Sequence, residues 1–310
     1  MIARVLKLLL ALQLLVAALL WLALRRHAGP YGAAALALAA LALLRLLLTA
    51  NSFWLSWRAR SATPAPLRPS AAARCRLFLG EFAATLLSSS WDMAWPRLAG
   101  QRGAAAAPSA LPVLLVHGYV CNGGYWAQLS RRLARAGVRH AAVDLEPPGA
   151  GIDAFVPQLH QAVEALCAAS GSARVIIVAH SMGGLVARAY LRGHGAARVA
   201  RVVTLGTPHH GTALAGLGPG LNARQMRRGG AWLEALAAAE GAPRRALFTS
   251  IFSHHDNIVA PQTSARLEGA KNIEFAGVGH VALGRDAGVL RCVLEEIALA
   301  SAERAESVFF

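Results

Sequence analysis

The chain has 310 residues, of which 55% are hydrophobic and 15% charged, and its mean hydropathy is positive at +0.43. This composition excludes an intrinsically disordered protein and indicates that part of the chain lies in lipid. The net charge of +15 is typical of nucleic-acid binders, but 29 of the 31 basic residues are arginine, and the first 108 residues carry 12 basic and two acidic side chains. We therefore favour anionic lipid over nucleic acid as the partner of this charge.

Two apolar runs occupy the first 50 residues. The first extends from Leu8 to Leu24 and is interrupted only by Gln13, and the second extends from Tyr31 to Ala50 with one charge, Arg45. Each run is long enough as a helix to cross a hydrocarbon core of about 30 Å, with Lys7 or Arg45 snorkelling toward the interface if needed. A turn at residues 27–30 separates the runs. The pattern predicts a transmembrane helical hairpin within a membrane anchor at residues 1–60.

Alternatives exist for both runs. The first run also fits a cleaved signal peptide, although it ends in Arg25 and Arg26 without a small-residue cleavage site. The second run also fits a buried core helix. Arginines are more numerous after the second run than in the turn, so the positive-inside rule places both ends of the hairpin in the cytoplasm.

Residues 61–108 are expected to form a linker and a juxtamembrane helix. Residues 61–75 are rich in proline and alanine, which is typical of a linker. Residues 76–99 predict a helix with Trp91 and Trp95 near its end. These tryptophans either lie at the membrane interface or pack on the following domain.

From residue 109 onward, short apolar strands alternate with amphipathic helices. The predicted strands are Val113–Val116, Val138–Val143, Arg174–Val178, Val199–Leu205, Leu247–Phe252 and Asn272–Phe275, and the predicted helices are Tyr125–Ala136, Ala154–Ala169, Leu185–Arg192 and Ala287–Ala300. Strands without alternation are typical of a parallel sheet buried on both faces. The pattern predicts one α/β domain at residues 109–310, with a mostly parallel central sheet covered by helices.

The strongest motif is Ala179-His180-Ser181-Met182-Gly183, which follows a strand and leads directly into a helix. A serine in this tight turn is presented above the sheet, and small neighbours let strand and helix approach one another. Ser181 is therefore the candidate nucleophile, with His180 and Gly183 shaping the turn. A serine that only caps the helix is the alternative.

A serine nucleophile needs a histidine base that is held by a carboxylate, and in this architecture the chain order is serine, acid, histidine. Only Asp256 and Asp286 follow Ser181 among the aspartates, and Asp286 lies at the start of a helix, where an acid has a structural reason to be. His280 is the sole histidine after Asp256. The chain order therefore selects Asp256 as the acid and His280 as the base. The remaining histidines are interpreted as structural.

Acyl transfer also needs two backbone N–H donors for the oxyanion. The residue after the nucleophile, Met182, supplies one. The loop after the first strand, His117-Gly118-Tyr119, supplies the other from Tyr119, because Gly118 permits a sharp turn and His117 helps to position the loop.

These motifs together resemble the α/β-hydrolase superfamily, and within it bacterial triacylglycerol lipases and esterases. The resemblance covers about residues 110–300 and includes the Gly-Thr-Pro-His-His-Gly stretch at 206–211. It implies Ser181, Asp256 and His280 as a catalytic triad, with Tyr119 and Met182 as oxyanion donors. Ala179 departs from the family's glycine.

No cofactor or metal is expected. The calcium-binding aspartates of some secreted lipases have no evident counterpart, because Asp256 is the only aspartate between Ser181 and Asp286. The four cysteines lie far apart, which disfavours a disulfide framework or a thiolate metal site.

The resemblance implies a serine hydrolase that cleaves carboxylic esters of apolar acyl chains. The two apolar runs and the positive-inside rule predict that it lies in the bacterial inner membrane, with two spans and a cytoplasmic catalytic domain. Residues 211–245, rich in leucine and glycine, form either a mobile lid or an ordinary surface excursion. A hydrolase of small soluble esters or thioesters is one alternative function. A catalytically silent, membrane-bound interaction module is another.

Overall fold

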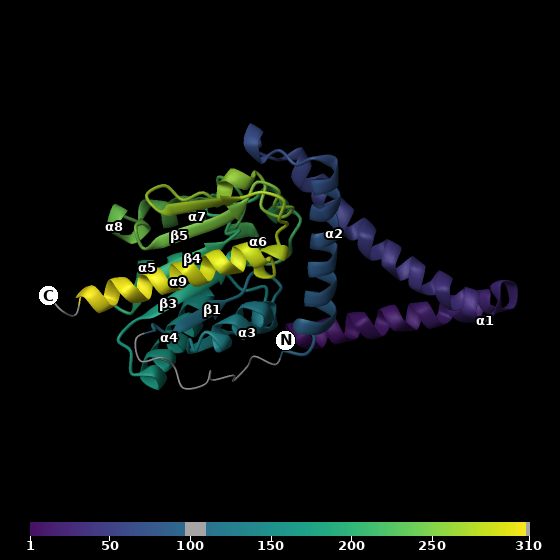
Figure 1. Cartoon of the computed structure of the whole chain (residues 1–310), viewed down its shortest axis with the longest axis horizontal. Helices are drawn as coiled ribbons and strands as arrows, with labels where there is room; N and C mark the ends of the chain where they lie inside the picture. Colours follow the sequence, from purple (N-terminus) through teal and green to yellow (C-terminus); the bar gives the residue numbers. More distant parts are fainter. Residues whose placement is uncertain (97–109, 308–310) are drawn as a thin grey trace.

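The structure is a computed structural model that describes residues 1–96 and 110–307. Its centre is a six-stranded sheet in the order β2-β1-β3-β4-β5-β6, in which every neighbouring pair is parallel (Figure 1). The strands are β1 (Val113–Val116), β2 (His140–Val143), β3 (Val175–His180), β4 (Val199–Leu205), β5 (Phe248–Ser253) and β6 (Lys271–Phe275). All six predicted strands are present, and their carboxyl ends meet at one edge of the sheet.

Helices cover both faces of this sheet. The longer helices of the α/β domain are α3 (Ala127–Arg135), α4 (Val156–Ser170), α5 (Met182–His194) and α9 (Ala287–Ser307). Successive residues of β1 point to opposite faces, so Leu114 packs in a cluster with α4 and α5, whereas Leu115 packs in a cluster with α3 and α9. In Figure 1, α9 crosses the near face of the sheet. This two-sided burial explains the continuous apolar strands.

Short helices occupy the connections. They are α6 (Leu221–Gln225), α7 (Ala231–Ala238) and α8 (Ala242–Arg245), the 3₁₀ turns η1 (Ala65–Leu67), η3 (Gly123–Trp126), η4 (Ile152–Phe155), η5 (Ala213–Gly216), η6 (Gln262–Ala265) and η7 (Ala282–Gly284), and the π-helical turn η2 (Ser88–Asp92). The segment from η5 to α8 lies within the expected lid.

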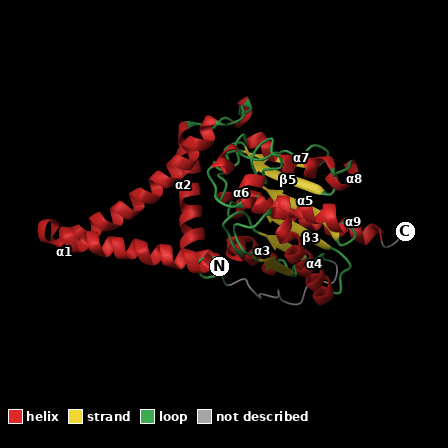
Figure 2. Cartoon of the chain, turned by 180° about the vertical axis from the view of Figure 1, so that it is seen from behind, coloured by secondary structure: helices red, strands yellow, loops and turns green. Residues whose placement is uncertain are grey.

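The N-terminal region consists of α1 (Ile2–Arg58) and α2 (Ala71–Leu87). Gly29 leaves helical geometry, with φ 72° and ψ 168°, and Pro30 follows it, so α1 has two arms that diverge from this point. The arms and α2 form the three sides of a triangle beside the sheet (Figures 1 and 2). The side chain of Ser70 caps α2, which therefore begins within the expected linker. The expected boundary at residues 108 and 109 lies outside the described residues.

The two polar residues that interrupt the apolar runs contact each other. Arg45 Nη2 donates a hydrogen bond of 2.8 Å to Gln13 Oε1, and Arg45 Nη1 donates one of 3.2 Å to Ser89 Oγ, in the turn η2 that follows α2. Arg45 thus connects both arms of α1 to η2. The guanidinium of Arg45 therefore has neutral acceptors between the helices.

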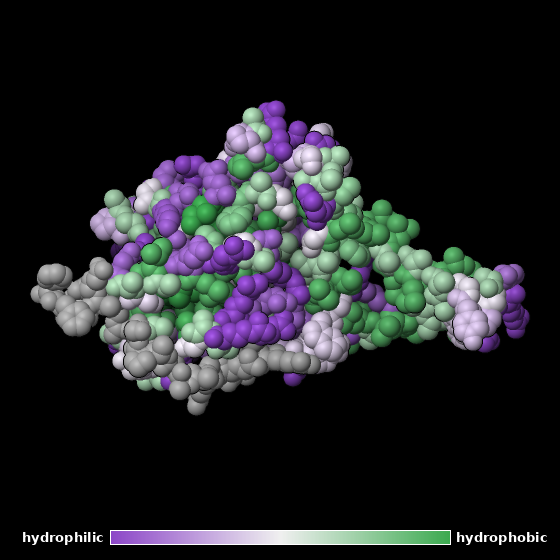
Figure 3. Space-filling model, viewed as in Figure 1, coloured by the Kyte–Doolittle hydropathy of each residue, from purple (hydrophilic) through white to green (hydrophobic). Residues whose placement is uncertain are grey.

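The outer surface of α1 is strongly apolar. Figure 3 shows hydrophobic side chains along both arms and hydrophilic ones at the tip between them. Many of the leucines are exposed, among them Leu8, Leu12, Leu14, Leu15, Leu19, Leu22, Leu38, Leu43, Leu47 and Leu48. By length and composition, α1 is the one helix among the described residues that is long and apolar enough to cross a membrane.

Candidate active site

Ser181 occupies a strained turn between β3 and α5. Its φ of 53° and ψ of −125° lie outside the regions that L-residues favour, and its N–H donates a hydrogen bond of 2.9 Å to the Leu205 carbonyl of β4. A Cβ on Gly183 would lie 2.6 Å from the His117 carbonyl oxygen, and one on Gly184 would lie 2.1 Å from Thr207 Oγ1. The turn therefore requires glycine at both positions, as the sequence-based interpretation of Gly183 expects.

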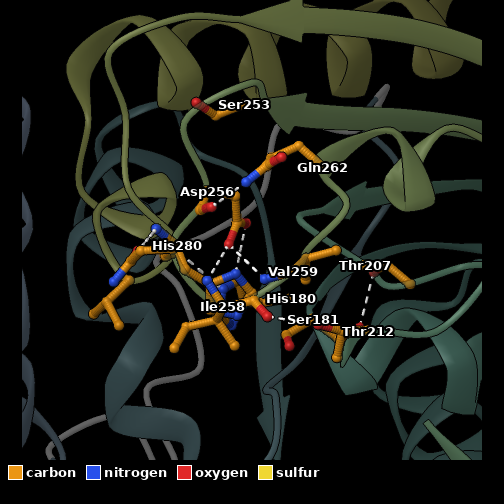
Figure 4. A network of polar contacts seen from close by, with 12 residues as sticks. His180, Ser181, Thr207, Thr212, Ser253, Asp256, Ile258, Val259, Gln262 and His280 are labelled. Carbon is orange, nitrogen blue, oxygen red and sulfur yellow. Dashed lines mark hydrogen bonds and ion pairs between the residues drawn. The ribbon is translucent and has the colours of Figure 1, made fainter. Parts of the chain in front are cut away.

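Asp256 and His280 form a buried hydrogen-bonded pair (Figure 4). Asp256 follows β5 and His280 follows β6, and the two residues are 2% and 5% exposed. Asp256 Oδ2 lies 2.7 Å from His280 Nδ1, while Asp256 Oδ1 accepts N–H hydrogen bonds of 2.8 Å from Ile258 and Val259. Because the carboxylate can only accept, the proton of His280 sits on Nδ1 and leaves Nε2 as the basic atom.

The environment of His280 favours its charged form. Burial by itself lowers the pKa of His280, but the charge of Asp256, the hydrogen bond to Asp256 and the charge of Glu81 outweigh it, so the pKa is raised. Such a histidine is stabilised when it has taken up a proton. This is the property required of a general base whose partner is a serine hydroxyl.

His180 lies beneath this pair. Its ring stacks on Tyr125, with centroids 4.1 Å apart, and its Nε2 lies 3.2 Å from the His280 carbonyl oxygen. Burial and the neighbouring charge of His280 hold the pKa of His180 well below its usual range. His180 thus contacts the His280 backbone as a neutral imidazole, and its positioning role stays a prediction.

The loop after β1 passes directly over Ser181. A Cβ on Gly118 would lie 2.9 Å from Ser181 Cβ, so only glycine fits there. His117 Nε2 accepts an N–H hydrogen bond of 2.9 Å from Leu145, and its Nδ1 donates to the Gly118 carbonyl at 2.9 Å. Burial keeps the pKa of His117 low, which suits this neutral arrangement. His117 and Gly118 therefore hold the loop next to the serine.

The two expected oxyanion donors flank the same point. Met182 begins α5, so its N–H belongs to the first helical turn, which has no acceptor within the helix. Tyr119 follows Gly118, and its hydroxyl donates a hydrogen bond of 2.6 Å to the Pro219 carbonyl across the cavity. Their roles as donors stay predictions.

The aspartate and histidines that the sequence did not assign to the site make contacts that explain them structurally. Asp286 Oδ1 accepts N–H hydrogen bonds of 2.9 Å from Gly288 and Val289 at the start of α9. His254 Nε2 lies 2.8 Å from Glu274 Oε2, and His209 Nε2 lies 3.2 Å from Thr204 Oγ1. No group of three or more potential metal ligands occurs within residues 1–96 and 110–307.

A cavity of about 300 Å³ opens onto Ser181. Its walls are mainly apolar and come from the loops after β1, β4 and β5, the segment from η5 to α6, and the second arm of α1. The lining residues include Tyr119, Leu214, Leu217, Met226, Val259 and Leu55. A side chain of α1 therefore takes part in the wall beside the candidate nucleophile.

The expected lid at residues 211–245 has two parts. The part around η5 and α6 covers the cavity and leaves Leu217 69% exposed. The later part is fixed to α5 by a buried ion pair, in which Arg188 donates hydrogen bonds of 2.8 and 2.7 Å to Glu240. Lid motion stays a prediction.

Known proteins share the fold of this domain. Residues 112–228 match the family model described as the alpha/beta hydrolase fold. This stretch of the chain has the α/β-hydrolase fold. The match confirms the resemblance that the sequence motifs indicate.

Two curated relatives are triacylglycerol lipases. The chain is 32% identical over 151 residues to the one from Burkholderia plantarii, which covers 41% of this chain and 40% of that protein. It is 32% identical over 122 residues to the one from Pseudarthrobacter phenanthrenivorans, covering 35% of this chain and 36% of that protein. The α/β-hydrolase chain thus spans less than half the length of the curated relatives it matches.

Solved lipases share the fold. The mature form of Bacillus licheniformis lipase BlEst2 has a TM-score of 0.58 at 20% identity, covering 64% of this chain and 96% of that chain. Aspergillus fumigatus lipase B has a TM-score of 0.51 at 19% identity, covering 62% and 53%. At these identities the likeness concerns the fold of the α/β-hydrolase domain alone.

Two contacts of the loop that carries His280 were not predicted from the sequence. Asn257 Oδ1 accepts the N–H hydrogen bond of His280 at 2.9 Å, and the carboxylate of Glu81 contacts the two residues that follow His280. Asn257 directly follows Asp256 in the sequence, and this position next to the candidate acid could have indicated a role in the site. Glu81 is one of only two acidic residues among the first 108, which is the one sequence feature that sets it apart.

Proposed function

We propose that this protein is a membrane-anchored serine hydrolase that cleaves carboxylic esters of apolar acyl chains. The observation that carries the proposal is the buried pair of Asp256 and His280, 2.7 Å apart, at the same sheet edge as a strained Ser181 that opens into an apolar cavity. The two triacylglycerol lipases that match part of the chain support the substrate class.

The chemistry is two-step acyl transfer. His280 Nε2 takes the proton of the Ser181 hydroxyl while the serine oxygen attacks the ester carbonyl, and Asp256 holds the imidazole and stabilises its positive charge. The N–H groups of Tyr119 and Met182 stabilise the oxyanion. Collapse expels the alcohol with the proton from His280. Water, deprotonated by His280, then releases the carboxylic acid from Ser181.

The membrane part of the proposal rests on α1. The exposed leucines of both arms have no partner in the described part of the chain that would cover them, and the arms are long enough to reach through a hydrocarbon core. We propose that both arms span the bacterial inner membrane as a hairpin with the α/β-hydrolase domain in the cytoplasm. Leu55 of α1 lines the Ser181 cavity, and this supports our proposal that apolar esters enter it from lipid.

The test is labelling of the full-length protein by a fluorophosphonate, which reacts with activated serines. We expect labelling of the wild type and its loss in Ser181→Ala, with Ser130→Ala as the matched control, since Ser130 is a buried serine whose hydroxyl bonds His140 away from the site. Absence of wild-type labelling would indicate a catalytically silent module. Preference for soluble short esters or thioesters over triacylglycerol emulsions would refute the apolar substrate class.

A further inference from the structure

Glu81 is the unexpected neighbour of the catalytic base. It lies in α2, outside the α/β-hydrolase domain, and is only 1% exposed. Its Oε1 accepts the N–H hydrogen bond of Val281 at 3.0 Å, and its Oε2 accepts that of Ala282 at 2.9 Å. Burying a carboxylate costs free energy unless both of its oxygens accept hydrogen bonds. Both oxygens of Glu81 accept one here, and the donors are the two residues directly after His280.

The residue before His280 contacts the same carboxylate. A Cβ on Gly279 would lie 2.4 Å from Glu81 Oε2, so the carboxylate packs against the Gly279 backbone as closely as glycine allows. Glu81 thus touches the chain on both sides of His280. The approach is specific to this loop and is not a general packing contact of α2.

The N–H of His280 itself is held by a second chain of contacts to the N-terminal helices. It donates to Asn257 Oδ1 at 2.9 Å, and Asn257 Nδ2 donates to Ser52 Oγ of α1 at 2.7 Å. Three consecutive backbone N–H groups therefore donate to side chains linked to the N-terminal helices. Those of residues 281 and 282 donate to Glu81 of α2, and that of His280 donates to Asn257, which is itself bonded to α1. The other acidic residue of the N-terminal region, Asp92, pairs with Arg285 in the same loop.

The charge of Glu81 acts on His280 as well. The charged or titratable side chains that face His280 are Asp256, Glu81 and His180. The pKa of Glu81 is raised, because burial and the charge of Asp256 outweigh its two backbone hydrogen bonds and the charge of His280. Two N–H donors at the two oxygens suit the ionised form, and the ionised form favours the imidazolium that His280 becomes during the reaction.

We propose that Glu81 is a positioning residue for His280, so that the N-terminal helices complete the active site in addition to attaching it to a membrane. The inference rests on the proposed function of Ser181, Asp256 and His280. Glu81 contacts no substrate. It fixes the loop that carries the base and stabilises the base when it is charged.

The experiment compares three variants of the full chain in detergent or lipid nanodiscs. Glu81→Gln keeps the shape and removes the charge, and Glu81→Asp keeps the charge and shortens the reach. Glu296→Gln is the matched control, because Glu296 is a buried carboxylate that bonds Thr249 and Lys271 and has no contact with the His280 loop. The readouts are the pH profile of kcat/KM, the NMR titration of His280 and deuterium uptake at residues 281 and 282.

For Glu81→Gln we expect the acid limb of kcat/KM and the His280 titration to move to lower pH, because the charge of Glu81 raises the pKa of His280. We expect kcat to fall about tenfold or more, since the base is less well placed. Glu81→Asp should leave the titration near that of the wild type and raise deuterium uptake at 281 and 282. Glu296→Gln should change none of these readouts.

The outcomes separate the two proposals. If the wild type reacts with a fluorophosphonate and Glu81→Gln has the same pH profile and deuterium uptake as Glu296→Gln, the inference is refuted and the function stands. If the wild type is inert, the function fails, and the titration and the uptake still decide whether Glu81 holds the His280 loop. If Glu81→Gln does not fold, wild-type uptake in Glu81→Asp refutes the inference, and raised uptake supports it.

Discussion

Replacement of Asp256 by asparagine probes the pair on which the proposed chemistry depends. The variant keeps an oxygen for the N–H groups of Ile258 and Val259 and changes only the atom facing His280 Nδ1. A carboxylate and an imidazolium whose charge centres are about 4 Å apart attract each other by about 4 kcal/mol at an effective dielectric constant of 20, which corresponds to about 10³ in rate. The amide also favours the tautomer with its proton on Nε2, which cannot accept from the serine. We therefore expect kcat to fall by about 10³–10⁴.

The assay is single-turnover hydrolysis of a chromogenic ester together with the rate of fluorophosphonate labelling, measured from pH 5 to 9. Without the charge of Asp256, burial dominates and lowers the pKa of His280, so the residual activity should reach its plateau at a lower pH than in the wild type. Unchanged thermal unfolding serves as the control for the fold. An Asp256→Asn variant that keeps more than a tenth of the wild-type kcat would refute the reasoning.

Two further predictions concern the buried ion pair and the cavity wall. Arg188→Met leaves buried Glu240 with only Arg245, 3.9 Å away, as a cationic neighbour, and should lower the free energy of unfolding by about 3 kcal/mol. Arg188→Met combined with Glu240→Leu should recover most of this loss in thermal or denaturant unfolding, and equal instability of both variants would contradict this. Leu55→Trp narrows the Ser181 cavity from the side of α1, so kcat/KM for long-chain esters should fall about tenfold and that for acetyl esters should stay within about twofold; an equal fall for both ester classes would show that α1 does not contact the acyl chain.

The elements that the sequence predicted well are those with a local pattern. The strand that ends at His180, the glycines after Ser181 and the helix that follows are contiguous, so their geometry is encoded within about 20 residues. Asp256 and His280 are distant from Ser181 in the sequence, but chain order and the scarcity of aspartates and histidines late in the chain singled them out. The structure places these two side chains in a hydrogen bond, and their catalytic role stays a proposal.

The contacts of the N-terminal helices were beyond the reach of pattern analysis. Helix α1 is apolar around its whole circumference, so its hydrophobic periodicity does not show which side of each arm faces the other arm. The contact between Gln13 and Arg45 therefore could not be predicted. Glu81 lies in a helix whose sequence carries no motif, and its partners are about 200 residues away in the chain. Such pairs depend on tertiary packing, which a single sequence does not specify locally. The early start of α2 was missed for another reason, because the Ser70 cap follows a proline-rich stretch that is typical of a linker.

The α/β-hydrolase domain is fastened to both arms of α1. Leu6 of the first arm packs on the cluster beneath α3 and α9, while Ser52 of the second arm bonds Asn257, and Ser61 just beyond it bonds Gln262. A domain joined to its membrane segment by one flexible linker rotates freely and meets substrate from any direction. Two attachment points remove that rotational freedom. With the proposed anchoring, the opening of the Ser181 cavity keeps a constant orientation toward the bilayer. Substrate lipids then reach this stationary opening by two-dimensional diffusion within the membrane.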